Sequence, residues 1–260
     1  MERVALCLAL NCALMAAVPA AAAAASMPAA ERRSGADVMG PELRAMQDDD
    51  AANPAGLWLL DGQALWDRKV GRAAKSCAEC HGTVEASMTG VAGRYPALVH
   101  GRLVDLEQRI NLCRTARQQA PPLAWEGHDL LALSALLARA SRGLPISPSA
   151  SPALRPFLVT GRRIFLRRQG QLNLSCAECH DDNWGRHLGG AVIPQGHPTG
   201  YPLYRLEWQS LGSLQRRLRN CMAGMRAEPY PYGAKQAVSL ELYLMWRARG
   251  MRIDAPAVRP

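Results

Sequence analysis

Lysine is almost absent from this chain of 260 residues. Lys69, Lys75 and Lys235 are the only three, and arginine supplies the rest of the 31 basic side chains. The formal net charge is +9 at pH 7, so anionic partners are expected. Nucleic acid is not among them, because the chain has no nucleic-acid-binding motif and no basic run interleaved with aromatic residues. The alternative interpretation is that the arginine content reflects genome composition.

Long apolar runs are also missing, except at the start. Arg3 precedes an apolar stretch over residues 4–18, and an alanine-rich tract over residues 20–25 offers several Ala-x-Ala cleavage sites. This plan predicts a cleaved signal peptide over residues 1–25. The alternative is an uncleaved anchor, since a membrane span needs about 20 apolar residues. No later segment is long and apolar enough, so we expect an exported protein with no membrane span in its mature chain.

Alternating strand patterns are the third absence. Residues 129–142 are rich in leucine and alanine at helical spacing, and residues 237–249 resemble them. Each half of the chain reads as a helix, a long loop, a second helix and a final helix. The predicted fold class is all-α.

Eight cysteines are present, and two of them, Cys7 and Cys12, fall in the predicted signal peptide. Four of the remaining six form two Cys-x-x-Cys-His motifs. In an exported chain this motif supplies two thiols that bond the haem vinyl groups and an adjacent histidine that binds the iron. The sequence therefore predicts two covalently bound haem c cofactors, with thioether bonds from Cys77, Cys80, Cys176 and Cys179 and with His81 and His180 as iron ligands.

The two halves of the chain are copies of each other. Both motifs read Ser-Cys-Ala-Glu-Cys-His, and Gly62 and Gly161 precede them by the same interval. A repeat of about 100 residues predicts tandem domains rather than a solenoid. Residues 145–152, rich in proline and serine, read as the linker. We expect two tandem cytochrome c-like domains related by internal duplication, over residues 26–148, with a mobile or loosely packed leading arm (26–55), and residues 149–260.

Each half has one further cysteine outside its haem motif, here called the spare cysteine. It is the last residue of an apolar stripe at helical spacing. The stripe recurs at equal spacing, since Leu103, Leu106, Ile110 and Cys113 correspond to Leu211, Leu214, Leu218 and Cys221. Positions i, i+3, i+7 and i+10 share one helix face, so each cysteine belongs to the interior of its own domain. This makes a Cys113–Cys221 disulfide awkward and favours cysteine as the sixth iron ligand at both haems. The rival ligands are not duplicated: Met225, His100, His128, His187 and His197.

A thiolate ligand lowers the potential of haem iron relative to methionine, which suits sulfur chemistry better than mid-potential electron transfer. Arg217 lies one helical turn before Cys221, and Arg226 lies just beyond it. Cations at this range favour the thiolate and attract anionic substrates, although haem propionates are their other expected partners. The predicted catalytic residues are Cys221, Arg217 and Arg226.

The segment around Cys221 reads Asn-Cys-Met-Ala-Gly-Met-Arg-Ala-Glu-Pro, over residues 220–229. Together with Gly62–Trp66, both haem motifs, Cys113 and residues 250–259, it resembles the SoxA family, the dihaem subunit of the periplasmic SoxAX cytochrome of bacterial thiosulfate oxidation. The resemblance covers nearly the whole mature chain.

The resemblance implies an L-cysteine S-thiosulfotransferase in the periplasm. Such an enzyme joins thiosulfate oxidatively to a cysteine of the carrier protein SoxYZ, and two electrons pass to a cytochrome c acceptor. Cys221 would be both a haem ligand and the reacting sulfur, found in the family as a persulfide, and Arg247 is a weaker candidate for the same pocket. A monohaem SoxX subunit would complete the heterodimer, and a copper requirement stays open.

Three other functions are compatible with the haem motifs. A dihaem electron-transfer cytochrome explains them but gives no reason for thiol ligation. A dihaem thiosulfate dehydrogenase would form tetrathionate without a carrier protein. A dihaem peroxidase would need an open or displaceable distal position.

Overall fold

The structure is a computed structural model that describes residues 27–260; the predicted signal peptide lies outside them. In the first half, helices and strands follow one another in the order α1 (Pro41–Asp48), α2 (Gly56–Asp67), α3 (Cys77–His81), α4 (Val84–Ser87), β1 (Ala97–Val99), β2 (Arg102–Val104), α5 (Leu106–Cys113) and α6 (His128–Arg139). A short π-helical segment, Arg114–Gln118, prolongs α5.

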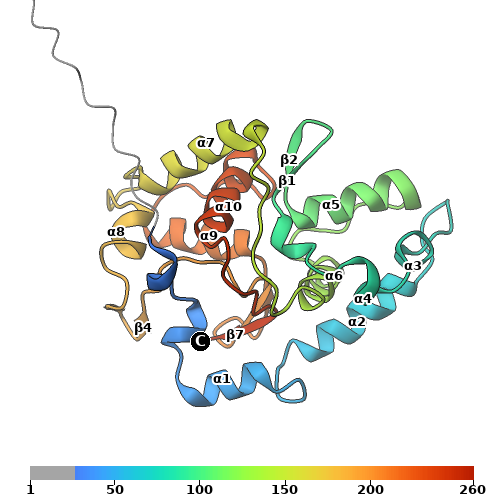
Figure 1. Ribbon diagram of the computed structural model, residues 1–260, viewed down its shortest axis with the longest axis horizontal. Helices are drawn as coiled ribbons and strands as arrows, with labels where there is room; N and C mark the ends of the chain where they lie inside the picture. The colour runs from blue at the N-terminus through green and yellow to red at the C-terminus, as the bar shows by residue number, and fades with distance from the viewer. Residues whose placement is uncertain (1–26) are drawn as a thin grey trace, which may run out of the picture.

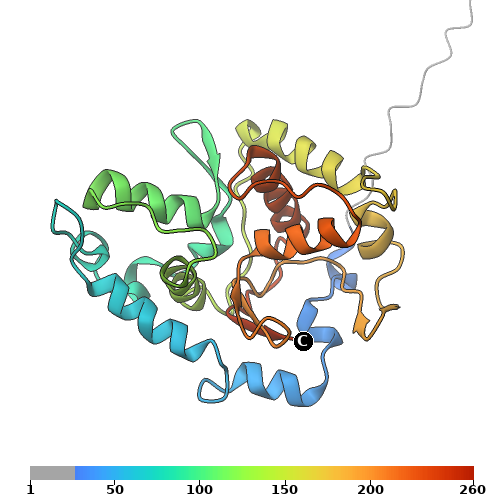
Figure 2. The same cartoon turned by 180° about the vertical axis from the view of Figure 1, so that it is seen from behind.

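The second half, which the structure describes throughout, repeats the order of α2, α3, β1, β2, α5 and α6, has no counterpart of α1 or α4, and adds three strands. Its elements are α7 (Arg155–Leu166), α8 (Cys176–His180), β3 (His187–Leu188), β4 (Ala191–Val192), β5 (Leu203–Arg205), β6 (Ser210–Gly212), α9 (Leu214–Gly224), α10 (Lys235–Arg247) and β7 (Ala257–Arg259). Figure 1 shows the two halves side by side, with α2 to α6 on the right and α7 to α10 on the left; Figure 2 shows the same from behind. Within residues 27–260, no helix combines the length and hydropathy needed to cross a bilayer.

Helices dominate, but the all-α prediction missed three small sheets. β1 pairs with β2 and β3 with β4, both antiparallel, and β5 lies between antiparallel β6 and parallel β7. These strands have only two or three residues each. Such short strands cannot show the period-two alternation by which a strand is read from sequence.

Each half is built on one close helix crossing, α2 on α6 and α7 on α10. A Cβ atom added to Gly62 would lie 2.5 Å from the Ala132 carbonyl oxygen, and one added to Gly161 would lie closer still to the Ser239 carbonyl oxygen. The duplicated glycines therefore let the two backbones of each pair approach directly. Apolar side chains close the core around each crossing, among them Leu65, Trp66, Leu133 and Leu136 in the first half and Ile164, Phe165, Leu240 and Leu244 in the second.

The ends of the two repeats hydrogen-bond to each other. The Gly143 amide donates to the Ile253 carbonyl at 2.8 Å, and the Gly250 amide donates to the Ile146 carbonyl at 2.8 Å. Ile146 and Ile253 then share one core cluster with Met245. The start of the predicted linker is therefore part of the contact that holds the halves together.

The arm, residues 27–48, packs against the second half. The Gln195 side chain accepts a hydrogen bond from the Arg33 amide at 2.6 Å, and the Arg259 guanidinium donates to the Gln47 side chain. In both views the arm runs beneath the second half before it reaches α2 (Figures 1 and 2). Hydrogen bonds therefore tie the arm to residues 162 to 212 positions further along the chain, although Gln47 is the one buried residue within 27–48.

We predict that the glycine crossings set stability. Gly62→Ala and Gly161→Ala force backbones apart, so each should lower the free energy of unfolding by about 2–3 kcal/mol, measured by denaturant unfolding of the haem-loaded protein. Gly224→Ala is the control, because its added Cβ meets nothing within 4 Å, and it should change stability by less than about 0.5 kcal/mol. Equal stabilities for all three variants would contradict this packing.

Candidate functional site

The second haem motif forms α8, and the residues at its start explain why the motif is helical. Ser175 and Glu178 make a capping box: the Ser175 Oγ accepts from the Glu178 amide at 3.2 Å, and the Glu178 carboxylate accepts from the Ser175 amide at 2.7 Å. Ser76 and Glu79 do the same for α3. The motif is therefore a self-capped turn that presents two thiols and an imidazole at fixed spacing.

His180 has a defined tautomer. Its Nδ1 lies 2.7 Å from the Pro194 carbonyl oxygen, which can only accept, so Nδ1 carries the proton. The Nε2 lone pair is left free for a metal. Asp181, the next residue, is paired with the buried Arg247 at 2.5 Å, and Arg247 in turn lies over the Phe165 ring at 4.5 Å. These contacts fix the end of α8.

Cys221 comes from α9 and faces His180. Burial alone would raise the pKa of its thiol, but the His180 side chain and the Arg217 and Arg205 guanidiniums outweigh burial and lower the pKa below its ordinary value. Burial, and then the neighbouring Cys221, raise the pKa of Cys176 to about 12. Cys176 and His180 of the motif are thus brought together with Cys221, the spare cysteine of this half.

A cavity of about 300 Å³ opens between them. Cys176 and His180 line it from α8, Cys221 and Arg217 from α9, and the arm lines it through Met39. The other walls are mainly apolar, as a porphyrin requires: Phe165, Leu214, Leu218, Met222, Met225, Leu240 and Leu244. An apolar cavity with thiols, a free imidazole nitrogen and an opposing thiol fits a covalently held haem.

The first motif shows the same juxtaposition. Burial, and then the neighbouring Cys113, raise the pKa of the Cys77 thiol. The His81 ring lies 5.8 Å from the Trp66 ring, centroid to centroid, and Met88 is buried in the core beside Trp66. The donor set around α3 therefore also fits a haem.

The rival sixth ligands fall into two groups. Met225 and His197 line the cavity, and His197 Nδ1 lies 2.9 Å from the Arg33 carbonyl. His100 and His187 are exposed, and His128 pairs with Asp61 at the surface. Cys221 is the residue that meets both His180 and the motif thiols.

The arginines are distributed differently from the prediction. Arg217 lines the cavity, but Arg226 is exposed and does not. Helix α9 ends at Gly224 and Arg226 turns away with φ +55°, so helical periodicity no longer applies there. Arg205 and Arg259 also line the cavity, and the sequence analysis did not identify them.

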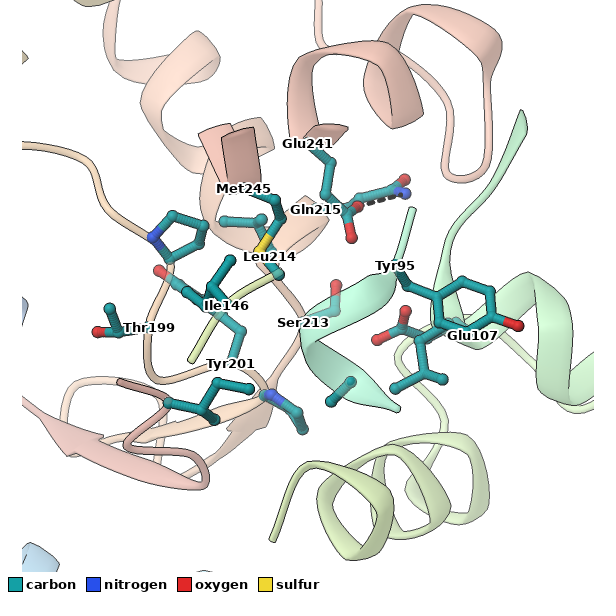
Figure 3. A pocket seen from close by; sticks show the side chains of 15 residues that line it. Tyr95, Glu107, Ile146, Thr199, Tyr201, Ser213, Leu214, Gln215, Glu241 and Met245 are labelled. Carbon is teal, nitrogen blue, oxygen red and sulfur yellow. Dashed lines mark hydrogen bonds between the residues drawn. The ribbon is translucent and has the colours of Figure 1, made fainter. Parts of the chain in front are cut away.

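A smaller cavity of about 50 Å³ lies between the halves (Figure 3). Glu107 lines it from the first half, and Gln215 and Glu241 line it from the second. The Gln215 amide donates to Asp105 at 2.6 Å and to Glu241 at 3.3 Å. Burial raises the pKa of Asp105 to about 7, and burial together with Asp105 raises the pKa of Glu107 to about 8 and that of Glu241 well above its usual range.

Two copies of a self-capped Cys-x-x-Cys-His helix, each with a cysteine-bearing helix opposite, define a duplicated cytochrome c-type protein. The family described as SoxA/TsdA, cytochrome c domain, matches residues 61–146 and 160–253. The chain belongs to this family, and its relatives within it are SoxA proteins.

Two curated relatives and one solved structure illustrate the similarity. The L-cysteine S-thiosulfotransferase subunit SoxA of Rhodovulum sulfidophilum is 36% identical over 88% of this chain and 80% of its own length. The protein of the same name from Pseudaminobacter salicylatoxidans is 33% identical over 93% of this chain and 86% of its own. The crystal structure of SoxXA from P. pantotrophus matches with a TM-score of 0.85 and 30% identity, over 88% of this chain and 87% of the matched chain.

The buried carboxyls between the halves predict a pH-dependent stability. Their folded-state pKa values exceed the values of about 4 expected in the unfolded chain, so the folded protein binds more protons between about pH 4 and 8. The free energy of unfolding should therefore fall as pH rises through this window, by up to about 1.4 kcal/mol per pH unit for each group that titrates.

Chemical denaturation of the haem-loaded protein at several pH values measures this slope. Glu241→Gln removes one of the groups and should flatten it. Glu42→Gln, at an exposed position in α1, is the control and should leave the slope unchanged. A slope that is the same in Glu241→Gln and in the parent would contradict the assignment.

Proposed function

We propose that this chain is the A subunit of an L-cysteine S-thiosulfotransferase, which joins thiosulfate oxidatively to a cysteine of a carrier protein. The observation that carries the proposal is the position of Cys221: it faces His180 across an apolar cavity, beside Arg217. The names of the SoxA relatives support the same activity.

Two haem c groups are proposed, one in each half. Cys77 and Cys80, and Cys176 and Cys179, would form the thioether bonds. His81 with Cys113, and His180 with Cys221, would be the axial ligands. The free state of all six cysteines and the approach of each spare cysteine to a motif thiol support this ligand set. When bound, the haem supplies one-electron redox chemistry next to the reacting sulfur.

The residues around the cavity divide the remaining tasks. The reaction converts thiosulfate and a carrier thiol into a carrier S-thiosulfonate, two electrons and one proton. Arg217 binds the anionic substrate, and its charge contributes to lowering the pKa of the Cys221 thiol. The Pro194 carbonyl orients His180, and Arg247 acts through Asp181 on the end of α8 rather than on the substrate.

The partners follow from the same activity. A monohaem SoxX-like subunit is proposed because the matching solved structure is a SoxXA protein. A SoxYZ-like carrier and a cytochrome c acceptor would supply the thiol and remove the electrons. We also propose a periplasmic location after cleavage of residues 1–25, and the division into domains 26–148 and 149–260.

Exchanging each spare cysteine for methionine separates the roles of the two halves. Cys221→Met keeps a sixth ligand for the iron but removes the thiolate, so transfer of thiosulfate to the carrier should fall by more than about 100-fold. Cys113→Met is the matched control and should keep most of the activity. Carrier mass reports the transfer, and intact mass of the variants counts their haems.

Electron paramagnetic resonance of the same samples should show a thiolate signal lost at one haem in each variant. A Cys221→Met protein that loads its haems and still modifies the carrier at the parent rate would refute the proposed function.

A further inference from the structure

The duplication lets one half serve as a control for the other. Arg217 has a counterpart in Arg109, so an arginine one turn before the cysteine is common to both halves. A shared feature does not distinguish the two sites, so Arg217 alone does not account for a task that only the second half performs. A charged residue found in the second half alone is the better candidate for a task that only the second site performs.

Strand register identifies such a residue. Leu103 and Leu211 are equivalent in the repeat, and they pair with Leu98 and Tyr204 respectively. The next residues along β1 and β5 are Val99 and Arg205. An apolar residue of the first half is therefore replaced by an arginine in the second.

Arg205 is held with part of its guanidinium free. Its side chain is 12% exposed, its Nη2 lies 2.9 Å from a Glu207 carboxylate oxygen, and its Nε donates to the Pro260 main-chain oxygen at 2.7 Å. Neither contact uses Nη1. The side chain also lines the large cavity, as Cys221 and Arg217 do.

Three arginines meet at this wall of the cavity. Arg205 is directly opposite Arg259 across the parallel pair β5 and β7, and Arg217 reaches the same cavity from α9. Asp254 pairs with Arg259 at 2.8 Å, whereas Arg217 forms no ion pair within residues 27–260. Burial and then Arg217 lower the pKa of Arg205, as expected for like charges held together. Glu207 and Asp254 offset two of the three charges, so within residues 27–260 Arg217 is the arginine of this wall that an incoming anion meets without a carboxylate partner.

We propose that Arg205 is a further substrate-binding residue, which together with Arg217 binds the sulfonate group of thiosulfate beside Cys221. This inference rests on the proposed function. The planar fork of arginine matches two oxygens of one oxyanion, so Arg205 and Arg217 can hold the sulfonate end while the outer sulfur faces Cys221. Haem propionates are the other anions that an arginine could bind here. An arginine for that purpose would be expected in both halves, whereas Arg205 occurs in the second half alone.

Arg205→Gln tests the assignment in the haem-loaded complex with its monohaem partner subunit. We expect the KM for thiosulfate to rise about tenfold, as for a lost charge-assisted hydrogen bond, while kcat stays within about twofold. Arg205→Lys keeps the charge but loses the two-pronged guanidinium, so its KM should lie between those of the parent and Arg205→Gln. Arg205→Lys replaces Arg205→Gln in the comparison if the latter does not accumulate. Arg102→Gln, exposed on β2 of the first half, is the control and should behave as the parent.

A second readout needs no carrier. Thiosulfate titrated into the oxidised complex, followed through the visible spectrum of the haems, should bind Arg205→Gln about tenfold more weakly, with the substrate-free spectrum and haem content unchanged. Unchanged KM and Kd would overturn the proposal. A changed substrate-free spectrum or haem content would overturn it in favour of a propionate contact. If the parent complex leaves the carrier unmodified, the proposed function fails, while the titration still decides on Arg205.

Discussion

The hydrogen bond between His180 and the Pro194 carbonyl fixes the orientation of the imidazole in the second site. It fixes which ring nitrogen faces the cavity, and the α9 helix then has to bring Cys221 to the same point. Helix α9 is started by Ser213, whose side chain accepts from the Arg216 amide, and it directly follows the sheet formed by β5 and β6. The Cys221 thiol is therefore positioned by the sheet and the start of α9, and the His180 imidazole by the loop that follows α8.

Duplication produced two similar haem-binding halves, and the differences between them concentrate at one. The second half adds the β3–β4 hairpin, a third strand in its sheet, and arginines where the first half has Val99 or no counterpart. Both halves keep the glycine crossing and the capped motif helix. The retained features are thus those that shape the motif helix, and the added strands β4 and β7, together with β5, contribute residues to the wall of the large cavity.

The sequence was sufficient for features that depend on local spacing. The haem motifs and the repeat follow from short intervals. The stripes were right from Leu106 to Cys113 and from Leu214 to Cys221, but Leu103 and Leu211 lie on β2 and β6 and not on these helices. Prediction from the sequence failed where a position depends on contacts between residues far apart in the chain or on where a helix ends. The position of Arg226 depends on the end of α9, and the cavity lining by Arg205 and Arg259 depends on a parallel strand pair that joins residues far apart in the chain.

The arm has a consequence for the order of maturation. Residues 27–48 are synthesised long before Gln195 and Arg259, the side chains that hold them. The wall that the arm gives to the large cavity therefore cannot close until almost the whole chain is present. The side of the large cavity formed by the arm is therefore completed only when an early segment of the chain has met some of the last residues to be made.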